Sequence, residues 1–163
     1  MAIITLNNNS LSSVTSLPAG VGGKVLQVVS NSYSSNIATT STSYVATGYT
    51  VTITPSSTSN KILIVVNGAS LDYDASSGDT ARLRWKLYSN INSAGYNSIN
   101  SQNINDVRFS YAYTTTVAGS FLYSPSTTNE VIIQPYFYST TGDNLYFNRT
   151  FATVTITAME VAG

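Results

Sequence analysis

The segment 51–68 constrains the fold of this chain most, because it holds two apolar runs of different pattern separated by a polar stretch. In the first run every second residue from Tyr49 to Ile53 is apolar, and the threonines between them face the other way. This period of two is typical of a strand with one buried face. The second run, Ile62–Val66, consists of consecutive apolar and mostly β-branched residues, which indicates a strand covered on both faces.

The residues around these runs indicate where each strand stops. Pro55 ends the first run because proline cannot donate to a ladder of hydrogen bonds. The Ser, Thr and Asn residues at 56–60 indicate a loop, and Asn67-Gly68 would allow a turn or a bulge after the second run. We therefore expect 51–68 to form the central β-hairpin of a β-sandwich.

Alternation with a period of two recurs along the chain, and no segment shows the periodicity of a helix. Loops are expected at 31–42 and 90–106, and Pro135 indicates an edge strand or a bulge. About eight strands at roughly ten-residue spacing predict an all-β fold, an antiparallel β-sandwich of jelly-roll type. The expected strands are 24–29, 44–54, 61–70, 80–88, one through 109–113, 120–123, 130–138 and 152–161, with two short additional ones near 96–99 and 145–147.

The first 23 residues differ from the rest. Pro18 and the glycines at 20, 22 and 23 indicate a flexible joint at 19–23, so we expect 1–23 to be an extended N-terminal arm and 24–163 to be the β-sandwich domain. The alternative is a frayed first strand. The apolar residues that would anchor the arm to a partner are Ile3, Ile4, Leu6, Leu11, Val14 and Leu17.

Composition argues against several classes of function. Of the 163 residues, 42% are hydrophobic, which suffices for the core of one domain, but only 9% are charged and the charges cancel, which argues against nucleic acid as a partner. The chain has no histidine and no cysteine, so no catalytic site, metal site, cofactor or disulfide is expected, and we do not expect an enzyme. Neither a signal peptide nor an apolar run of membrane-spanning length is visible.

The strand 80–88 alternates most regularly. Alternate positions that include Trp85 should enter the core, as should Ile156 in the last strand, whereas Arg82, Arg84 and Lys86 share the opposite face. That basic stripe would suit an anionic partner or an acidic glycan, although a solvated outer face is the expectation.

Tyrosines form two same-face pairs, Tyr111 with Tyr113 and Tyr136 with Tyr138. Tyrosines of this kind contact protein partners or stack on sugars, and we favour packing or a protein interface.

Two local motifs receive the plainer interpretation. The segment 72–79, D-Y-D-A-S-S-G-D, could offer oxygen ligands to calcium, but its spacing is not that of an EF-hand and a solvated turn is expected. The triplet Asn148-Arg149-Thr150 matches a glycosylation acceptor, which we take to be chance in a chain without a visible secretion signal.

The scarcity of charge and the apolar run 62–66 together predict a homo-oligomer, and we expect a homotrimer.

Four segments together resemble small virion proteins of tailed phages that infect cyanobacteria and other aquatic bacteria. They are L-N-N-N-S-L-S-S-V-T-S-L-P-A-G near the start, G-G-K-V-L-Q-V-V, T-I-T-P-S-S-T-S-N-K-I-L-I, and A-T-V-T-I-T-A-M-E-V-A-G at the end. The resemblance covers nearly the whole chain and carries no catalytic residues. It implies a place on the outer surface of the virion, a trimeric β-knob and an N-terminal attachment arm.

The chain has no heptad, collagen-like or β-helical repeat that would form the shaft of a fibre. Within the resembled class we therefore expect a head-decoration, or cement, protein whose arm binds the major capsid protein or another virion protein. A short tail-fibre or receptor-binding protein that recognises a host-surface glycan is the alternative, followed by a free-standing carbohydrate-binding module.

Overall fold

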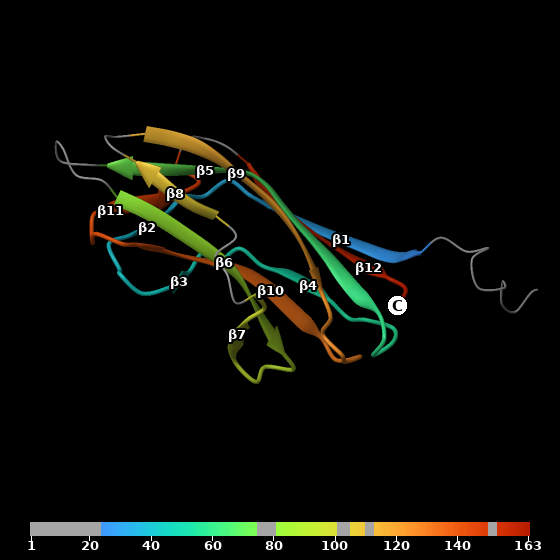
Figure 1. Ribbon diagram of the computed structural model, residues 1–163. Coiled ribbons are helices and arrows are strands. Elements are labelled where there is room, and N and C mark those ends of the chain that lie inside the picture. Colours follow the sequence, from blue (N-terminus) through green and yellow to red (C-terminus); the bar gives the residue numbers. More distant parts are fainter. Residues whose placement is uncertain (1–23, 75–80, 101–104, 110–112, 150–152) are drawn as a thin grey trace, which may run out of the picture.

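The computed structural model describes residues 24–74, 81–100, 105–109, 113–149 and 153–163, and these form two antiparallel β-sheets packed face to face (Figure 1). This confirms the predicted all-β sandwich. Sheet A contains β1 (Val25–Tyr33), β2 (Ile37–Thr39), β5 (Lys61–Asp74), β9 (Tyr113–Tyr123), β11 (Asn144–Phe147) and β12 (Val154–Val161). Sheet B contains β3 (Val45–Ala46), β4 (Val51–Ile53), β6 (Ala81–Ile91), β7 (Tyr96–Ser98), β8 (Asn105–Phe109) and β10 (Val131–Ser139).

Several short strands follow one another along the same row of a sheet. When each such pair is counted as one strand, the strand order is that of a jelly roll. The first half of β5 pairs with β12 and its second half with β11, while β1 and β2 pair with β12 and β11 in turn. Sheet A is therefore four strands wide, in the order β1/β2, β12/β11, β5, β9, and sheet B follows the order β3/β4, β10, β6, β7/β8. With each in-line pair counted as one strand, successive strands alternate between the two sheets except for β6 and β7/β8, which are consecutive and pair in sheet B, as in a jelly roll.

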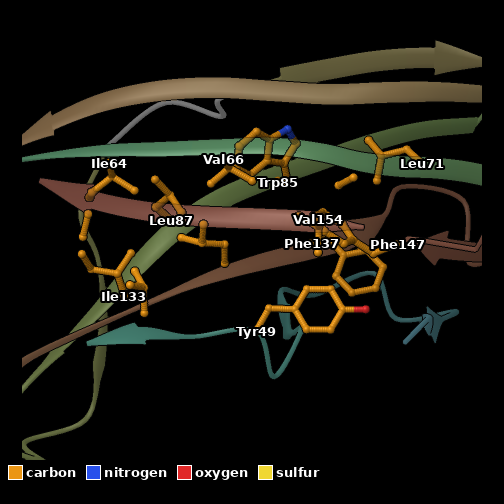
Figure 2. Packing of buried hydrophobic residues seen from close by; sticks show 14 of the residues in the cluster. Tyr49, Ile64, Val66, Leu71, Trp85, Leu87, Ile133, Phe137, Phe147 and Val154 are labelled. Carbon is orange, nitrogen blue, oxygen red and sulfur yellow. The ribbon is translucent and has the colours of Figure 1, made fainter. Parts of the chain in front are cut away.

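The core lies between the sheets and is aromatic at its centre (Figure 2). Trp85 and Ile156 are both fully buried, as predicted. Phe137 of sheet B and Phe147 of sheet A meet with ring centroids 5.5 Å apart, which joins the two layers directly. Along β6, buried residues alternate with the half-buried Arg84 and Lys86, so the predicted facing of this strand is confirmed where its side chains are described.

The expected hairpin at 51–68 is wrong. Both strands are present, but β4 pairs with β10 in sheet B and β5 pairs with β9, β11 and β12 in sheet A. Ile53 and Ile62 therefore enter the core from opposite sides, and the loop between them crosses from one sheet to the other. An alternating pattern marks a buried face but does not show whether its neighbour lies beside it or opposite it.

The apolar run of β5 is covered on one face only. Ile62, Ile64 and Val66 are fully buried, whereas Leu63 and Val65 on the other face are partly exposed. The bulge allowed at Asn67-Gly68 is present: the register to β9 shifts between Val66 and Ala69, and the strand then continues to Asp74.

Three other expectations differ from the structure. The predicted loop 31–42 contains the end of β1 and all of β2. The predicted strand through 109–113 is two strands, because β8 ends at Phe109 in sheet B and β9 begins at Tyr113 in sheet A. Pro135 lies in β10, an interior strand, and not at an edge.

Proline is tolerated at that position because the neighbouring strand is interrupted between β3 and β4. The Pro135 carbonyl accepts hydrogen bonds from the amide and the hydroxyl of Thr47, at 3.1 and 2.9 Å, within this interruption. Since the carbonyl and nitrogen of a strand residue point to the same side, the missing N–H faces the same gap.

Candidate interaction surfaces

The outer face of sheet B brings together four of the residues singled out in the sequence. Tyr136 and Tyr138 of β10 lie opposite Lys86 and Arg84 of β6, and all four alternate with core positions. The other three predicted contact residues are not part of this described cluster. Arg82 lies in β6 but its side chain is outside the described residues, as is Tyr111, and Tyr113 begins β9 in the other sheet.

Three further tyrosines complete this surface. Tyr88 and Tyr96 contact Tyr136, with ring centroids at 4.1 and 5.7 Å, and Tyr44 contacts Tyr138 at 4.6 Å. Tyr44 also lies 5.9 Å from Tyr88, so the rings form one connected group. We call this group the tyrosine face; it consists of Tyr44, Tyr88, Tyr96, Tyr136 and Tyr138.

Both cations of β6 whose side chains are described contact these tyrosines. Lys86 Nζ lies 5.4 Å from the centre of the Tyr44 ring, and Arg84 Nη1 donates to the Tyr138 hydroxyl at 2.9 Å. The basic stripe expected from the sequence is therefore part of an aromatic surface.

Ionisation of three of these tyrosines is suppressed. Burial raises the pKa of Tyr88 and Tyr96, and burial together with repulsion from Tyr96 and Tyr88 raises the pKa of Tyr136. These three phenols stay neutral at physiological pH, so they can both donate and accept hydrogen bonds. Half-buried neutral rings of this kind can stack on a sugar or be covered by a protein partner.

The outer face of sheet A carries a second surface of different chemistry. Val28 lies opposite Met159, Met159 opposite Leu63, and Leu63 opposite Leu122, so one apolar row crosses all four strands. Val28 is 58% exposed and Leu122 is 51% exposed. Next to the row, Val25 and Leu26 are also about half exposed, at the point where residues 1–23 join the sandwich. We call Val28, Met159, Leu63 and Leu122 the apolar row.

The remaining sequence expectations concern the N-terminal arm, a calcium site and a membrane span. The arm residues Ile3, Ile4, Leu6, Leu11, Val14 and Leu17 lie outside them. Asp72 is buried in β5 and accepts hydrogen bonds from Ser70 and Thr114, and the described residues contain no cluster suited to a metal ion. No helix long and apolar enough to cross a membrane occurs in the described part of the chain.

The glycosylation match falls on a buried side chain. Asn148 Nδ2 donates to the carbonyls of Tyr33 and Ser35, at 3.2 and 3.0 Å, and the residue is 1% exposed. A glycan on this nitrogen would break both bonds, which agrees with interpreting the match as chance.

Sequence analysis missed part of each surface, mainly because the pairing register between strands is not visible in one strand alone. Tyr88 continues the alternation of Arg84 and Lys86 and could have been added from the sequence. Tyr44, just before β3, and Tyr96, at the start of β7, join the group only through the pairing of strands. The apolar row takes one residue from each of four strands, so its existence depends on four registers together.

No protein-family model and no curated protein sequence matches the chain. Among solved structures, the chain is similar to one titled "Structure of infectious bursal disease virus Gt strain", with 12% identity, a TM-score of 0.42, and coverage of 84% of this chain and 38% of that one. The structure of the Gx strain of the same virus gives 9% identity, a TM-score of 0.41, and coverage of 83% and 29%. The crystal structure of the infectious bursal disease virus VP2 subviral particle gives 12% identity, a TM-score of 0.42, and coverage of 83% and 38%. The chain spans well under half of the length of each of these chains.

Proposed function

We propose that this chain is a non-enzymatic structural protein on the outer surface of a tailed-phage particle, namely a head-decoration (cement) protein that attaches to the shell through residues 1–23. The virion assignment comes from the resemblance of the four sequence segments. The structural observation that supports a role in assembly is the apolar row. A contiguous apolar stripe that is partly exposed on a sheet usually marks a surface that a partner covers.

The energetics of the arm favour attachment by backbone pairing as well as by side chains. Full burial of six apolar side chains would contribute about 9–18 kcal/mol. Ordering 23 residues costs about 1–2 kcal/mol each, or roughly 23–46 kcal/mol. Side-chain burial alone is therefore insufficient, and we propose that the arm adds a strand to an open sheet edge of the major capsid protein or another virion protein. Several arms in one homotrimer would strengthen this contact through effective concentration.

Locating the chain in a density map of the intact particle tests this proposal. Many copies spread over the shell would support decoration. A few copies at the tail would contradict it and favour a fibre, and absence from the particle would overturn the virion role itself.

A second candidate function, recognition of a host-surface glycan by a short tail-fibre or receptor-binding protein, is favoured by the tyrosine face. Tyrosine rings beside Arg84 and Lys86 offer stacking surfaces and hydroxyl hydrogen bonds together. Binding of host-surface polysaccharide by the purified protein, measured calorimetrically, would support it, provided that Tyr136→Ala removes the heat. The Asn97→Ala variant, altered at an exposed position of β7, is the matched control.

A further inference from the structure

We propose that the outer face of sheet A is the surface through which copies of this chain associate, with the apolar row at the centre of the contact. This specifies one contact within the proposed structural role. It is tested on the purified protein alone, so it can fail while attachment to a particle stands, and the reverse.

The apolar row lies where the hydrophobic centre of an interface is expected. Its four side chains are successive cross-strand neighbours, so at strand spacings of about 4.8 Å the row is roughly 14 Å long. Its two ends, Val28 and Leu122, lie on the two edge strands and are the more exposed. The row therefore runs across the whole width of the sheet.

The residues beside the row can be covered at little cost. The next row along the strands consists of Ser30, Thr157, Val65 and Ser120. Ser30 and Thr157 hydrogen-bond each other through their hydroxyls at 2.9 Å, and Ser32 bonds Thr155 in the same way at 3.1 Å. Hydroxyl groups that already have partners lose less when water is removed, and neither row contains a charge that would have to be desolvated. On the other side of the row Val161 lies opposite the exposed Lys61, so one charge stands at the border, where it can stay in contact with water. An apolar centre with a polar border is the usual anatomy of a protein interface.

The orientation of the apolar row favours a second copy over a short peptide as the occupant. In the second half of β5 the outward residues Ser70 and Asp72 are buried, so the open part of the face is the half in which β5 pairs with β12, roughly 23 by 19 Å. Stable interfaces bury about 800 Å² on each partner, so this half would form the centre of a contact that also uses the loops around it. A single extended segment laid along the face would cover about one strand's width and leave much of the row exposed.

The edge strand that carries Val28 is fixed in place, which suits contact through the face. Gln27 Nε2 donates to the carbonyl of Thr54 at 2.7 Å, and Asn31 Nδ2 donates to that of Thr50 at 2.9 Å. These bonds tie β1 to the β4 segment of the opposite sheet. A preorganised face loses little freedom on association.

Sedimentation of the full chain at about 1–100 µM tests the proposal. We expect an oligomer for the wild type, and for the double variant Val28→Lys/Leu122→Lys a dissociation constant raised about 100-fold, because like charges would then face each other. The control Asn97→Lys/Asn129→Lys adds the same charge at exposed positions of β7 and the loop before β10, and should keep the wild-type mass. A monomeric wild type at the highest concentration, or an unchanged mass for the double variant, would overturn the inference.

A second measurement avoids disruptive charge. The chain contains no cysteine, so Leu122→Cys creates a single thiol at the end of the row. Its reaction with a maleimide should slow at least tenfold as the protein concentration rises from about 1 to 100 µM. The thiol of Asn97→Cys should react at one rate throughout. Concentration-independent labelling of position 122 would contradict the proposal even if the protein is oligomeric, because the copies would then meet elsewhere.

Discussion

The Glu160 carboxylate accepts a hydrogen bond of 2.7 Å from the side-chain amide of Asn60, 100 residues earlier in the chain. The same carboxylate accepts bonds from the amide and hydroxyl of Ser56, at 2.6 and 2.7 Å, and from Gln27 at 2.7 Å. Glu160 is 1% exposed. One buried charge therefore joins β1, β12 and the loop in which the chain crosses from sheet B to sheet A.

We expect Glu160→Gln to lower the free energy of unfolding by about 3 kcal/mol at pH 7, because glutamine keeps the volume but loses the charge-assisted bonds and turns an N–H₂ group towards donors. Urea denaturation measures the change. Glu130→Gln, at an exposed position before β10, is the control and should change stability by less than about 0.5 kcal/mol.

The same carboxyl makes stability depend on pH. Burial acts to raise the pKa of Glu160, but the bonds from Asn60, Gln27 and Ser56 outweigh it and lower the pKa from 4.5 to about 2. The unfolded chain therefore binds this proton first as the pH falls. At about 1.4 kcal/mol for each pH unit, the carboxylate contributes about 3 kcal/mol, which is fully present above pH 4.5 and lost as the pH falls towards 2. Glu160→Gln should remove this part of the acid sensitivity. An equally steep acid transition in the variant would show that other groups cause it.

The bulge in β5 requires glycine at position 68. Gly68 has a φ of +86°, and a Cβ there would collide with the backbone carbonyl oxygen of Thr153. Gly48 has a similar φ of +77° but open space around it. We expect Gly48→Ala to cost about 1–2 kcal/mol from backbone strain alone, and Gly68→Ala at least about 2 kcal/mol more. Equal melting temperatures for the two variants would contradict the close approach.

Trp85 offers a test of the core. The ring is fully buried, and its Nε1 has no hydrogen-bond partner among the described residues. Trp85→Ala should cost about 3–5 kcal/mol through lost burial and the cavity left behind. Trp85→Phe should cost clearly less, because it also removes the unpaired N–H. Thermal unfolding compares the two; an unchanged melting temperature for Trp85→Ala would contradict its place in the core.

The sequence predicted strands and their facing well where one strand decides its own pattern. The alternation around Trp85 and Ile156 correctly assigned core and outer faces, and of the turn or bulge allowed at Asn67-Gly68 the structure has the bulge. The pairing of strands could not be predicted in this way. The apolar runs that contain Ile53 and Ile62 are joined by a short polar loop, as the strands of a hairpin would be, yet they belong to different sheets. The loop 54–60 crosses from sheet B to sheet A, and it bonds to Glu160, a residue 100 positions after Asn60 in the chain.

The candidate surfaces were predictable to the same extent. Arg84 and Lys86 were correctly expected on the outer face of their strand, and Tyr136 and Tyr138 were correctly expected to share one face of theirs, because each pair follows the alternation within a single strand. The apolar row escaped notice because Leu122 and Val28 look like isolated residues until the register places them in line. Which residues meet on the surface of a sheet depends on how its strands pair, and this pairing cannot be predicted from the sequence of one strand.

Deleting residues 1–23 tests the proposed attachment most directly. The truncated protein should fold, stay soluble, and keep its melting temperature and oligomeric state, because the core and the apolar row both lie within 24–163. Full-length and truncated protein are added to particles purified without this protein, and bound copies are counted by quantitative mass spectrometry. We expect full occupancy for the complete chain and near-background occupancy for the truncated one. Equal occupancy of the two would contradict attachment through the arm.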